Sequence, residues 1–171
     1  RFLPPIASGT ITATLAFGER GLNWCNSAVT AVATPLTDGY SLSGYFQHVP
    51  DGTSAQLLLV PGRILGRDEI LLFAVPADVE GVDRHHCVTI DATRRLAEIR
   101  LNAVKIREDA IASTRSGIDD GLARTSALAA IALAAEQLGG AQQCLDMTLA
   151  YIAERHQFGR PISSFQAIKH R

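Results

Sequence analysis

The side chains best suited to chemistry lie together in the last quarter of the sequence. Arg155 lies near the end of a long apolar helical pattern, and its planar guanidinium can donate paired charged hydrogen bonds. Gln157, Phe158 and Gln166 follow within the same short segment. Each also has an ordinary structural explanation. Arg155 could complement a helix dipole, Phe158 could pack in a core, and Gln166 could complete a capping box.

Cysteine and histidine give no comparable site. Cys25, Cys87 and Cys144 are odd in number and widely separated, without the paired spacing of metal ligands or of a disulfide framework. His85 and His86 are adjacent, and neighbouring residues on a strand face opposite ways. We therefore expect no metal site.

The composition is that of a globular protein. Hydrophobic residues make up 47% of the 171 residues and charged residues 19%, which supplies enough apolar side chains for a core. The 16 basic and 17 acidic residues nearly cancel, which argues against binding to nucleic acid or to a membrane surface. No apolar run reaches the roughly 20 residues that span a bilayer, and no signal peptide is visible. We therefore expect a cytoplasmic protein.

Short β-type segments fill the first part of the sequence. Residues 28–34 and 40–46 flank Thr37-Asp38-Gly39, a strong turn signal, and predict a hairpin. Other runs predict strands at 11–17, 56–60, 70–75, 87–90 and 96–101. Regular spacing, with Gly and Pro between the runs, favours an antiparallel β-sandwich or barrel over alternating β-α units. We predict an α+β protein whose first domain, residues 1–112, has this architecture.

The second part, residues 113–171, has a helical period. Apolar residues recur every seven positions, at Ile131, Leu138, Leu145 and Ile152. This spacing predicts a long amphipathic helix of a bundle over 118–158, ended by Gly159 in the left-handed conformation. Ser163 and Gln166 then form a candidate capping box of a second helix. Because so incomplete a helix pair cannot bury its own apolar stripe, we expect the helical bundle domain to be incomplete here.

The segment YIAERHQFGRPISSFQAIKH, residues 151–170, resembles the signature of the acyl-CoA dehydrogenase family. That signature is a tyrosine, three residues, arginine, any residue, Gln-Phe-Gly, any residue, Pro-Ile, two residues and Phe-Gln, and every fixed position is matched. Residues 38–44 and 91–104 resemble the family's middle β-domain more weakly. The resemblance identifies 1–112 as that middle domain and 113–171 as the start of the C-terminal helical domain.

The resemblance implies an FAD-dependent enzyme that desaturates the α,β bond of an acyl-CoA thioester. In the family, this corner of one subunit reaches the adenosine-pyrophosphate half of an FAD that a neighbouring subunit mainly binds. Carried over, Arg155 would bridge the pyrophosphate and Gln157 would bond a phosphate or ribose. Phe158 would pack against the cofactor, and Gln166 would lie near the adenine. The implied partners are an acyl-CoA and either further copies of this chain or a paralogous dehydrogenase subunit.

The residues that the family offers to the flavin ring differ here. The family's Thr-Glu pair and Gly-Ser-Asp turn match residues 13–22, where Leu15 and Gly21 replace the two hydroxyl residues. Thr14 could compensate only through a one-residue register slip, which would turn it to the opposite face of the strand. The family's Trp-Ile-Thr-Asn segment is here HVPD, residues 48–51, so an imidazole replaces the indole and a proline replaces the threonine.

No carboxylate of the chain can be assigned as the catalytic base. In most family members the glutamate that removes the α-proton lies C-terminal to the residues present here. In a minority it lies on the long helix, where alignment back from Leu138 gives Ala129. Glu136 is on that helix, but one or two turns out of place, and is explained as a solvated residue.

Three interpretations stay open. The chain could be the non-catalytic partner in a mixed dehydrogenase assembly, offering Arg155 to a neighbour's FAD. It could equally be a divergent homo-oligomeric enzyme whose pocket tolerates the substitutions. A protein of a different class, a scaffold homologue that binds no flavin, would keep only the fold and its subunit contacts.

Overall fold

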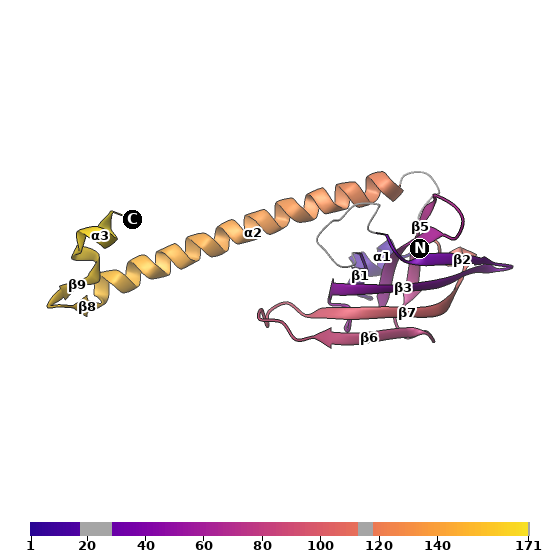
Figure 1. Ribbon diagram of the computed structural model, residues 1–171, viewed down its shortest axis with the longest axis horizontal. Helices are drawn as coiled ribbons and strands as arrows, with labels where there is room; N and C mark the ends of the chain where they lie inside the picture. Colours follow the sequence, from indigo (N-terminus) through magenta and orange to yellow (C-terminus); the bar gives the residue numbers. More distant parts are fainter. Residues whose placement is uncertain (18–28, 113–117, 171) are drawn as a thin grey trace. The chain divides into compact units, whose positions relative to one another are not determined.

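The computed structural model of the protein describes residues 1–17, 29–112 and 118–170 (Figure 1). The chain divides into two compact units, Arg1–Arg124 and Thr125–Arg171. The predicted domain boundary at residues 112 and 113 adjoins residues outside the described ranges, and it stays a prediction.

The first unit is built on strands. It opens with a short helix, α1 (Leu3–Ala7), which has proline in its first turn, where a missing backbone N–H costs nothing. The described strands that follow are β1 (Ala13–Leu15), β2 (Val32–Leu36), β3 (Gly39–Pro50), β4 (Leu57–Ile64), β5 (Ile70–Pro76), β6 (Val82–Cys87) and β7 (Leu96–Arg107). A 3₁₀ turn, η2 (Glu108–Ala110), comes after β7. The predicted strands overlap the observed ones, except that the segment 87–90 meets β6 only at Cys87.

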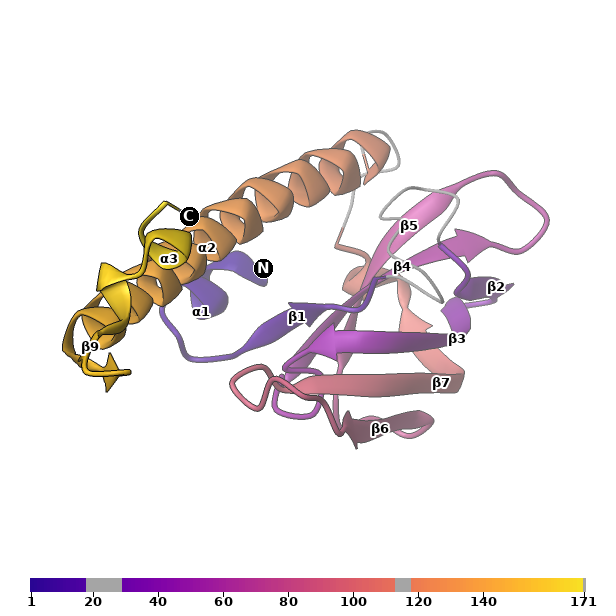
Figure 2. The ribbon, with the colours of Figure 1, turned by 60° about the vertical axis from the view of Figure 1, so that its left-hand side comes forward.

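These strands form one curled sheet, which Figure 2 shows from the side. Hydrogen-bonded neighbours run in the order β1-β4-β2-β3-β7-β6, and β5 pairs with β4. Most pairs are antiparallel, as predicted, but β1 and β2 both run parallel to β4. Parallel neighbours need a long connection, and here the chain builds β3 before it returns from β2 to β4. The purely antiparallel expectation is therefore corrected to a mixed sheet.

The predicted hairpin is confirmed as β2 and β3, with Leu36 opposite Gly39. Gly39 has φ +141°, and a Cβ built on it would collide with the backbone oxygen of Ile106 on β7. Both the backbone conformation and the close approach of β7 therefore require glycine at this turn.

The main core consists of apolar side chains from the central strands. Phe73, Leu58 and Ile99 are fully buried, and Tyr40 packs edge-on against Phe73 with ring centroids 5.4 Å apart. Burying a side chain of this size contributes about 1.5–3 kcal/mol. This core fixes the sheet and therefore the positions of the residues at its strand ends.

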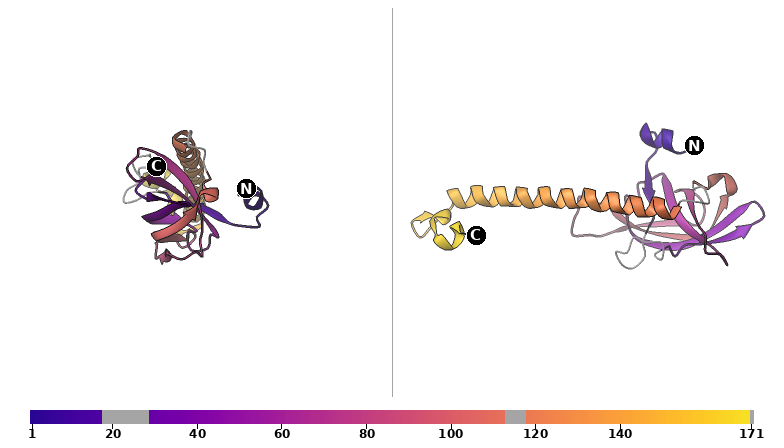
Figure 3. Two further views of the ribbon diagram at one scale, coloured as in Figure 1. Left: turned by 90° about the vertical axis from the view of Figure 1, so that its right-hand side faces the viewer. Right: turned by 90° about the horizontal axis from the view of Figure 1, so that it is seen from above.

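The second unit consists mostly of α2 (Ile118–Glu154), a helix of 37 residues that begins in the first unit and runs without a break (Figure 3). After it come β8 (His156–Gln157), β9 (Arg160–Pro161), the 3₁₀ turn η3 (Ile162–Ser164) and α3 (Gln166–Lys169). The long helix is confirmed, but it ends at Glu154 rather than at Phe158. The capping-box prediction is wrong, because the N-cap of α3 is Phe165 and no side chain caps it.

Apolar residues lie on two sides of α2. The predicted heptad side includes Ile131, Leu138 and Leu145, which are 52–72% exposed. Leu133 and Met147, 44% and 62% exposed, lie about half a turn away. A helix that is apolar on opposite sides is typical of a bundle interior, so the single predicted stripe describes only half of the pattern. Among the described residues, no helix is both long and apolar enough to cross a membrane.

Candidate functional site

The predicted site residues lie at and just beyond the C-terminal end of α2, on a tight β-hairpin. β8 and β9 pair antiparallel, with Gln157 opposite Arg160. The two residues between them, Phe158 and Gly159, have φ values of 54° and 77°. Two consecutive left-handed residues are the mark of a type I′ turn, which matches the twist of a hairpin. The left-handed Gly159 is thus confirmed, but it turns a hairpin rather than ending the helix.

Backbone hydrogen bonds attach this hairpin to the end of α2. The N–H of Arg155 still donates to the Tyr151 oxygen at 2.9 Å, which is a helical bond. The Arg155 oxygen in turn accepts from the N–H of Ile162 at 2.9 Å, on the far side of the hairpin. This second bond closes the loop at its base. The backbone of Arg155 is consequently held at both its donor and its acceptor.

Aromatic contacts hold the tip of the hairpin. The Phe158 ring is 92% exposed and packs edge-on against the Phe165 ring, with centroids 6.2 Å apart and an interplanar angle of 85°. The guanidinium of Arg160 lies 4.0 Å from the centroid of the same Phe165 ring. Phe165 is therefore the centre of a small cluster that joins β9, the turn and the start of α3. The sequence had singled out neither Arg160 nor Phe165, although both lie inside the signature.

The structure places each predicted site residue on the surface of the second unit. Arg155, Gln157 and Gln166 are all exposed. Over the described ranges no acidic side chain forms an ion pair with Arg155, so its guanidinium is available to an external anion. In the same ranges, no hydrogen bond joins the side chain of Gln166 to the other three residues. The geometry thus brings Arg155, Gln157 and Phe158 onto one loop, while Gln166 follows on the next helix.

The first unit holds the positions that the resemblance associates with a flavin ring. Leu15 is half-buried and packs against a small apolar cluster that contains Phe17, Ile70 and Leu122. The hydroxyl of Thr14 donates to the Pro50 oxygen at 2.7 Å. A leucine has no donor, and the neighbouring threonine has committed its own to the protein. Gly21, the other substituted position, lies outside the described residues.

The HVPD segment, residues 48–51, lies at an irregularity between β3 and β7. The register of the two strands shifts between Phe46 and Val49, and exposed His48 has φ 57°. Pro50 pairs with Leu96 and can offer no N–H. Left-handed backbone in a non-glycine residue costs about 1–3 kcal/mol, so the surrounding strands must hold this bulge in place.

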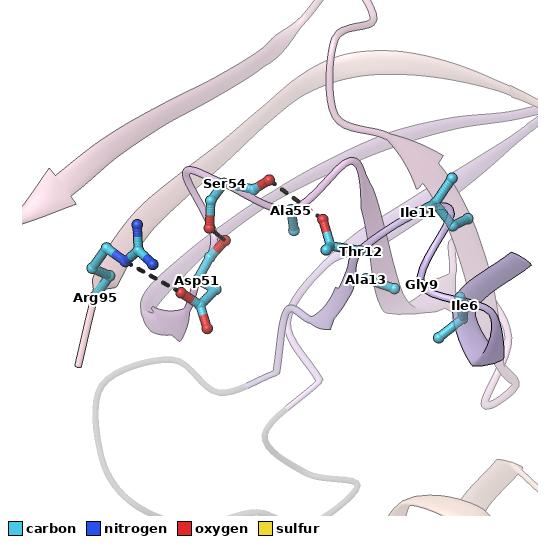
Figure 4. Close-up of a pocket in the computed structure, with 9 residues that line it drawn as sticks. All are labelled: Ile6, Gly9, Ile11, Thr12, Ala13, Asp51, Ser54, Ala55 and Arg95. Atoms are coloured by element: carbon cyan, nitrogen blue, oxygen red, sulfur yellow. Dashed lines mark hydrogen bonds and ion pairs between the residues drawn. The ribbon is translucent and has the colours of Figure 1, made fainter. Parts of the chain in front are cut away.

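A cavity of about 580 Å³ lies beside the end of this segment, between α1, β1 and the turn that follows β3 (Figure 4). Asp51 and Arg95 line it and form an exposed ion pair with N···O 3.7 Å. The guanidinium of Arg84, on β6, donates to the backbone oxygens of Gly52, Thr53 and Ala55 at 3.0–3.2 Å. These three hydrogen bonds hold the turn against β6.

Comparison with known proteins decides the family. Residues 122–171 match the family described as Acyl-CoA dehydrogenase, C-terminal domain. The chain belongs to the acyl-CoA dehydrogenase family. The chain is 52% identical over 83 residues, 48% of its length and 23% of the relative, to acyl-CoA dehydrogenase IpdE2 of Mycolicibacterium smegmatis. It is 31% identical over 179 residues, 98% of its length and 46% of the relative, to the probable acyl-CoA dehydrogenase YngJ of Bacillus subtilis.

Solved structures agree on the fold. Butyryl-CoA dehydrogenase from Megasphaera elsdenii matches 99% of this chain and 46% of its own, with TM-score 0.84 and 23% identity. A glutaryl-CoA dehydrogenase from Mycobacterium smegmatis in complex with FADH2 matches 99% of this chain and 44% of its own, with TM-score 0.81 and 20% identity. The chain spans less than half the length of these relatives.

Proposed function

We propose that the whole protein is a subunit of an FAD-dependent acyl-CoA dehydrogenase, which introduces a double bond between the α and β carbons of an acyl-CoA thioester. Residues 1–112 would be its middle β-domain and 113–171 the start of its helical domain. In this proposal Arg155, Gln157, Phe158 and Gln166 contribute to FAD binding across a subunit interface. Family membership supports the reaction class, and a neighbour of the same fold was solved with FADH2.

One observation carries the proposal: at the end of α2 the exposed Arg155, which has no ion-pair partner in the described ranges, is followed three residues later by the exposed ring of Phe158. A pyrophosphate is a double anion, and a guanidinium can bridge its oxygens in a planar, two-bond geometry. The 92% exposed Phe158 offers an apolar surface on the same hairpin. These residues fit the adenosine diphosphate end of FAD.

The residues at the other end of the cofactor do not fit equally well in this chain. The hydroxyl that would serve a flavin ring is replaced by Leu15, and the Thr14 hydroxyl is bound to the Pro50 oxygen. The chain thus keeps the residues that it would offer to a neighbour's FAD, Arg155 and Phe158. It lacks the hydroxyl that it would offer to a flavin ring of its own. This asymmetry favours a flavin ring held mainly by another subunit.

Bound FAD would supply the hydride acceptor of the reaction. The residues of this chain would hold and orient it: Arg155 by neutralising the diphosphate, Gln157 by bonding a phosphate or ribose, and Phe158 by covering apolar surface. Gln166 would lie near the adenine. No carboxylate of the chain is assigned as the base that removes the α-proton, so that group would come from residues beyond 171 or from another subunit.

A second subunit fits the two-sided apolar pattern of α2, since exposed Leu133 and Met147 lie opposite the heptad side. The partner would be another copy of the chain or a paralogous dehydrogenase subunit. The missing donors around Leu15 favour the paralogue. The alternative function, a scaffold homologue without flavin, is favoured by the same missing donors and must be tested with it.

The visible absorption spectrum of the full-length protein separates these proposals. The protein would be purified alone and after co-expression with a neighbouring paralogous dehydrogenase gene. We expect bound flavin in the co-expressed complex and little or none in the protein alone. Flavin bound by the protein alone would support a homo-oligomeric enzyme instead. A colourless complex that also lacks acyl-CoA desaturation would leave the scaffold as the function.

A further inference from the structure

We infer that Arg160 is a positioning residue of the proposed FAD site: it holds Phe158 in place through Phe165 and does not itself contact the diphosphate. This inference rests on the proposed function, since it assigns a residue to the same site. The signature leaves this position open to any residue. The assignment therefore comes from the geometry of this chain.

Two successive contacts connect Arg160 with the exposed tip of the hairpin. Its guanidinium lies 4.0 Å from the centroid of the Phe165 ring, which is within the range of a strong cation–π contact. The edge of the Phe158 ring meets the ring of Phe165 at a centroid distance of 6.2 Å. Fixing Phe165 from one side therefore limits where Phe158 can turn on the other.

Phe158 needs such support because little else restrains it. It occupies a left-handed position of the turn, with φ 54°, and 92% of it is exposed. A ring so exposed loses rotamer freedom when it packs against a ligand, and that loss weakens binding. Contacts that restrict the ring beforehand reduce the loss. Phe165 and Arg160 supply those contacts in the free protein.

The two arginines of the loop are thus assigned different tasks. Arg155 lies at the helix end and has no ion-pair partner in the described ranges, so it can meet a phosphate directly. The guanidinium of Arg160 instead lies over the Phe165 ring. A cation that neutralises a phosphate makes binding salt-dependent, whereas a stacked cation that only positions a ring leaves the salt dependence unchanged.

The test measures FAD affinity of the full-length assembly at low and high ionic strength, after removal and return of the cofactor. We compare Arg160→Met and Phe165→Leu, singly and together, with Arg155→Met as the reference for a phosphate contact. An exposed cation–π contact corresponds to about a two- to fivefold change in affinity. We expect Arg160→Met to weaken FAD binding by that factor at both ionic strengths.

The energetic coupling between Arg160 and Phe165 provides a readout that a general loss of structure would not give. Because both side chains act through one cluster, the double variant should bind FAD no more weakly than Phe165→Leu alone. The melting temperature of the cofactor-free assembly should stay within about a degree of the wild type, since an exposed contact contributes little to stability.

Three results would overturn the inference while leaving the proposed function intact. They are wild-type affinity in Arg160→Met, additive losses in the double variant, and a loss of salt dependence like that of Arg155→Met. A melting temperature lowered in proportion to the loss of affinity would show a structural role instead. A wild-type assembly that binds no FAD would refute the proposed function itself.

Discussion

Replacing Arg155 by methionine should weaken FAD binding strongly and barely alter stability. Methionine keeps the length and apolar stem of the side chain and removes the charge and its donors. Hydrogen bonds to charged groups contribute about 1.5–3 kcal/mol, which corresponds to about a 10- to 150-fold weaker affinity. In the free protein the side chain is exposed and, over the described ranges, without an ion-pair partner, so removing its charge breaks no ion pair there. The remaining effect on folding is the interaction with the helix dipole, about 0.3–1 kcal/mol.

The assay is titration of the cofactor-free, full-length assembly with FAD, followed by flavin fluorescence. Arg124→Met is the matched control, because Arg124 is an exposed arginine of the same helix at its other end. The control should bind FAD as the wild type does, at low and at high salt. Unchanged FAD affinity in Arg155→Met, or an equal loss in both variants, would refute the assignment of the diphosphate to Arg155.

Three further predictions, made with four substitutions, test the first unit. Gly39→Ala should lower the melting temperature clearly, because a left-handed φ and a backbone collision both oppose a Cβ. Gly66→Ala meets open space and should cost only the backbone strain of about 1–3 kcal/mol. Thr14→Val should cost about 0.5–1.5 kcal/mol of stability by urea unfolding and leave FAD affinity unchanged, and a loss of flavin would show that this hydroxyl serves the cofactor. The Thr93 hydroxyl and backbone N–H bonds lower the pKa of Asp91, so Thr93→Val should raise that pKa toward its usual value in an NMR titration. Since the folded pKa is depressed, the contribution to stability is present above the unfolded pKa and is lost as the pH falls through the folded pKa.

The resemblance to the family signature singled out the candidate site residues, which are close together in the sequence. Arg155 and Phe158 are separated by two residues, and the long helix that precedes them was predicted from the heptad pattern. The backbone conformation of the loop nevertheless needed the structure. A left-handed glycine is equally typical of a helix end and of a type I′ turn, and the sequence analysis chose the first for Gly159.

The cluster around Phe165 could not be predicted from the same pattern. Ser163 and Gln166 have the spacing of a capping box. Ile162–Ser164 instead forms a 3₁₀ turn, and Phe165 is the N-cap of α3. That shift turns the Phe165 ring toward both Arg160 and Phe158. The contact depends on where a short turn ends, which side-chain propensities specify poorly.

The sequence pattern also does not specify which strands pair when they are far apart in the chain. The turn at Gly39 predicted its hairpin correctly, because a two-residue connection brings the two adjacent strands side by side. The parallel pairs of β1 and β2 with β4 join residues more than twenty positions apart, such as Ala13 and Leu57. Apolar alternation indicates that each segment is a strand but does not indicate its neighbour.

The central claim is that Arg155 meets the diphosphate of an FAD held chiefly by another subunit. A structure of the full-length assembly with FAD bound tests it most directly, through the distance between the guanidinium nitrogens of Arg155 and the diphosphate oxygens. We expect at least one such distance of about 2.7–3.0 Å, with the flavin ring of that FAD lying against the neighbouring subunit. An Arg155 side chain in open solvent, or an FAD contained wholly within one subunit, would contradict the account.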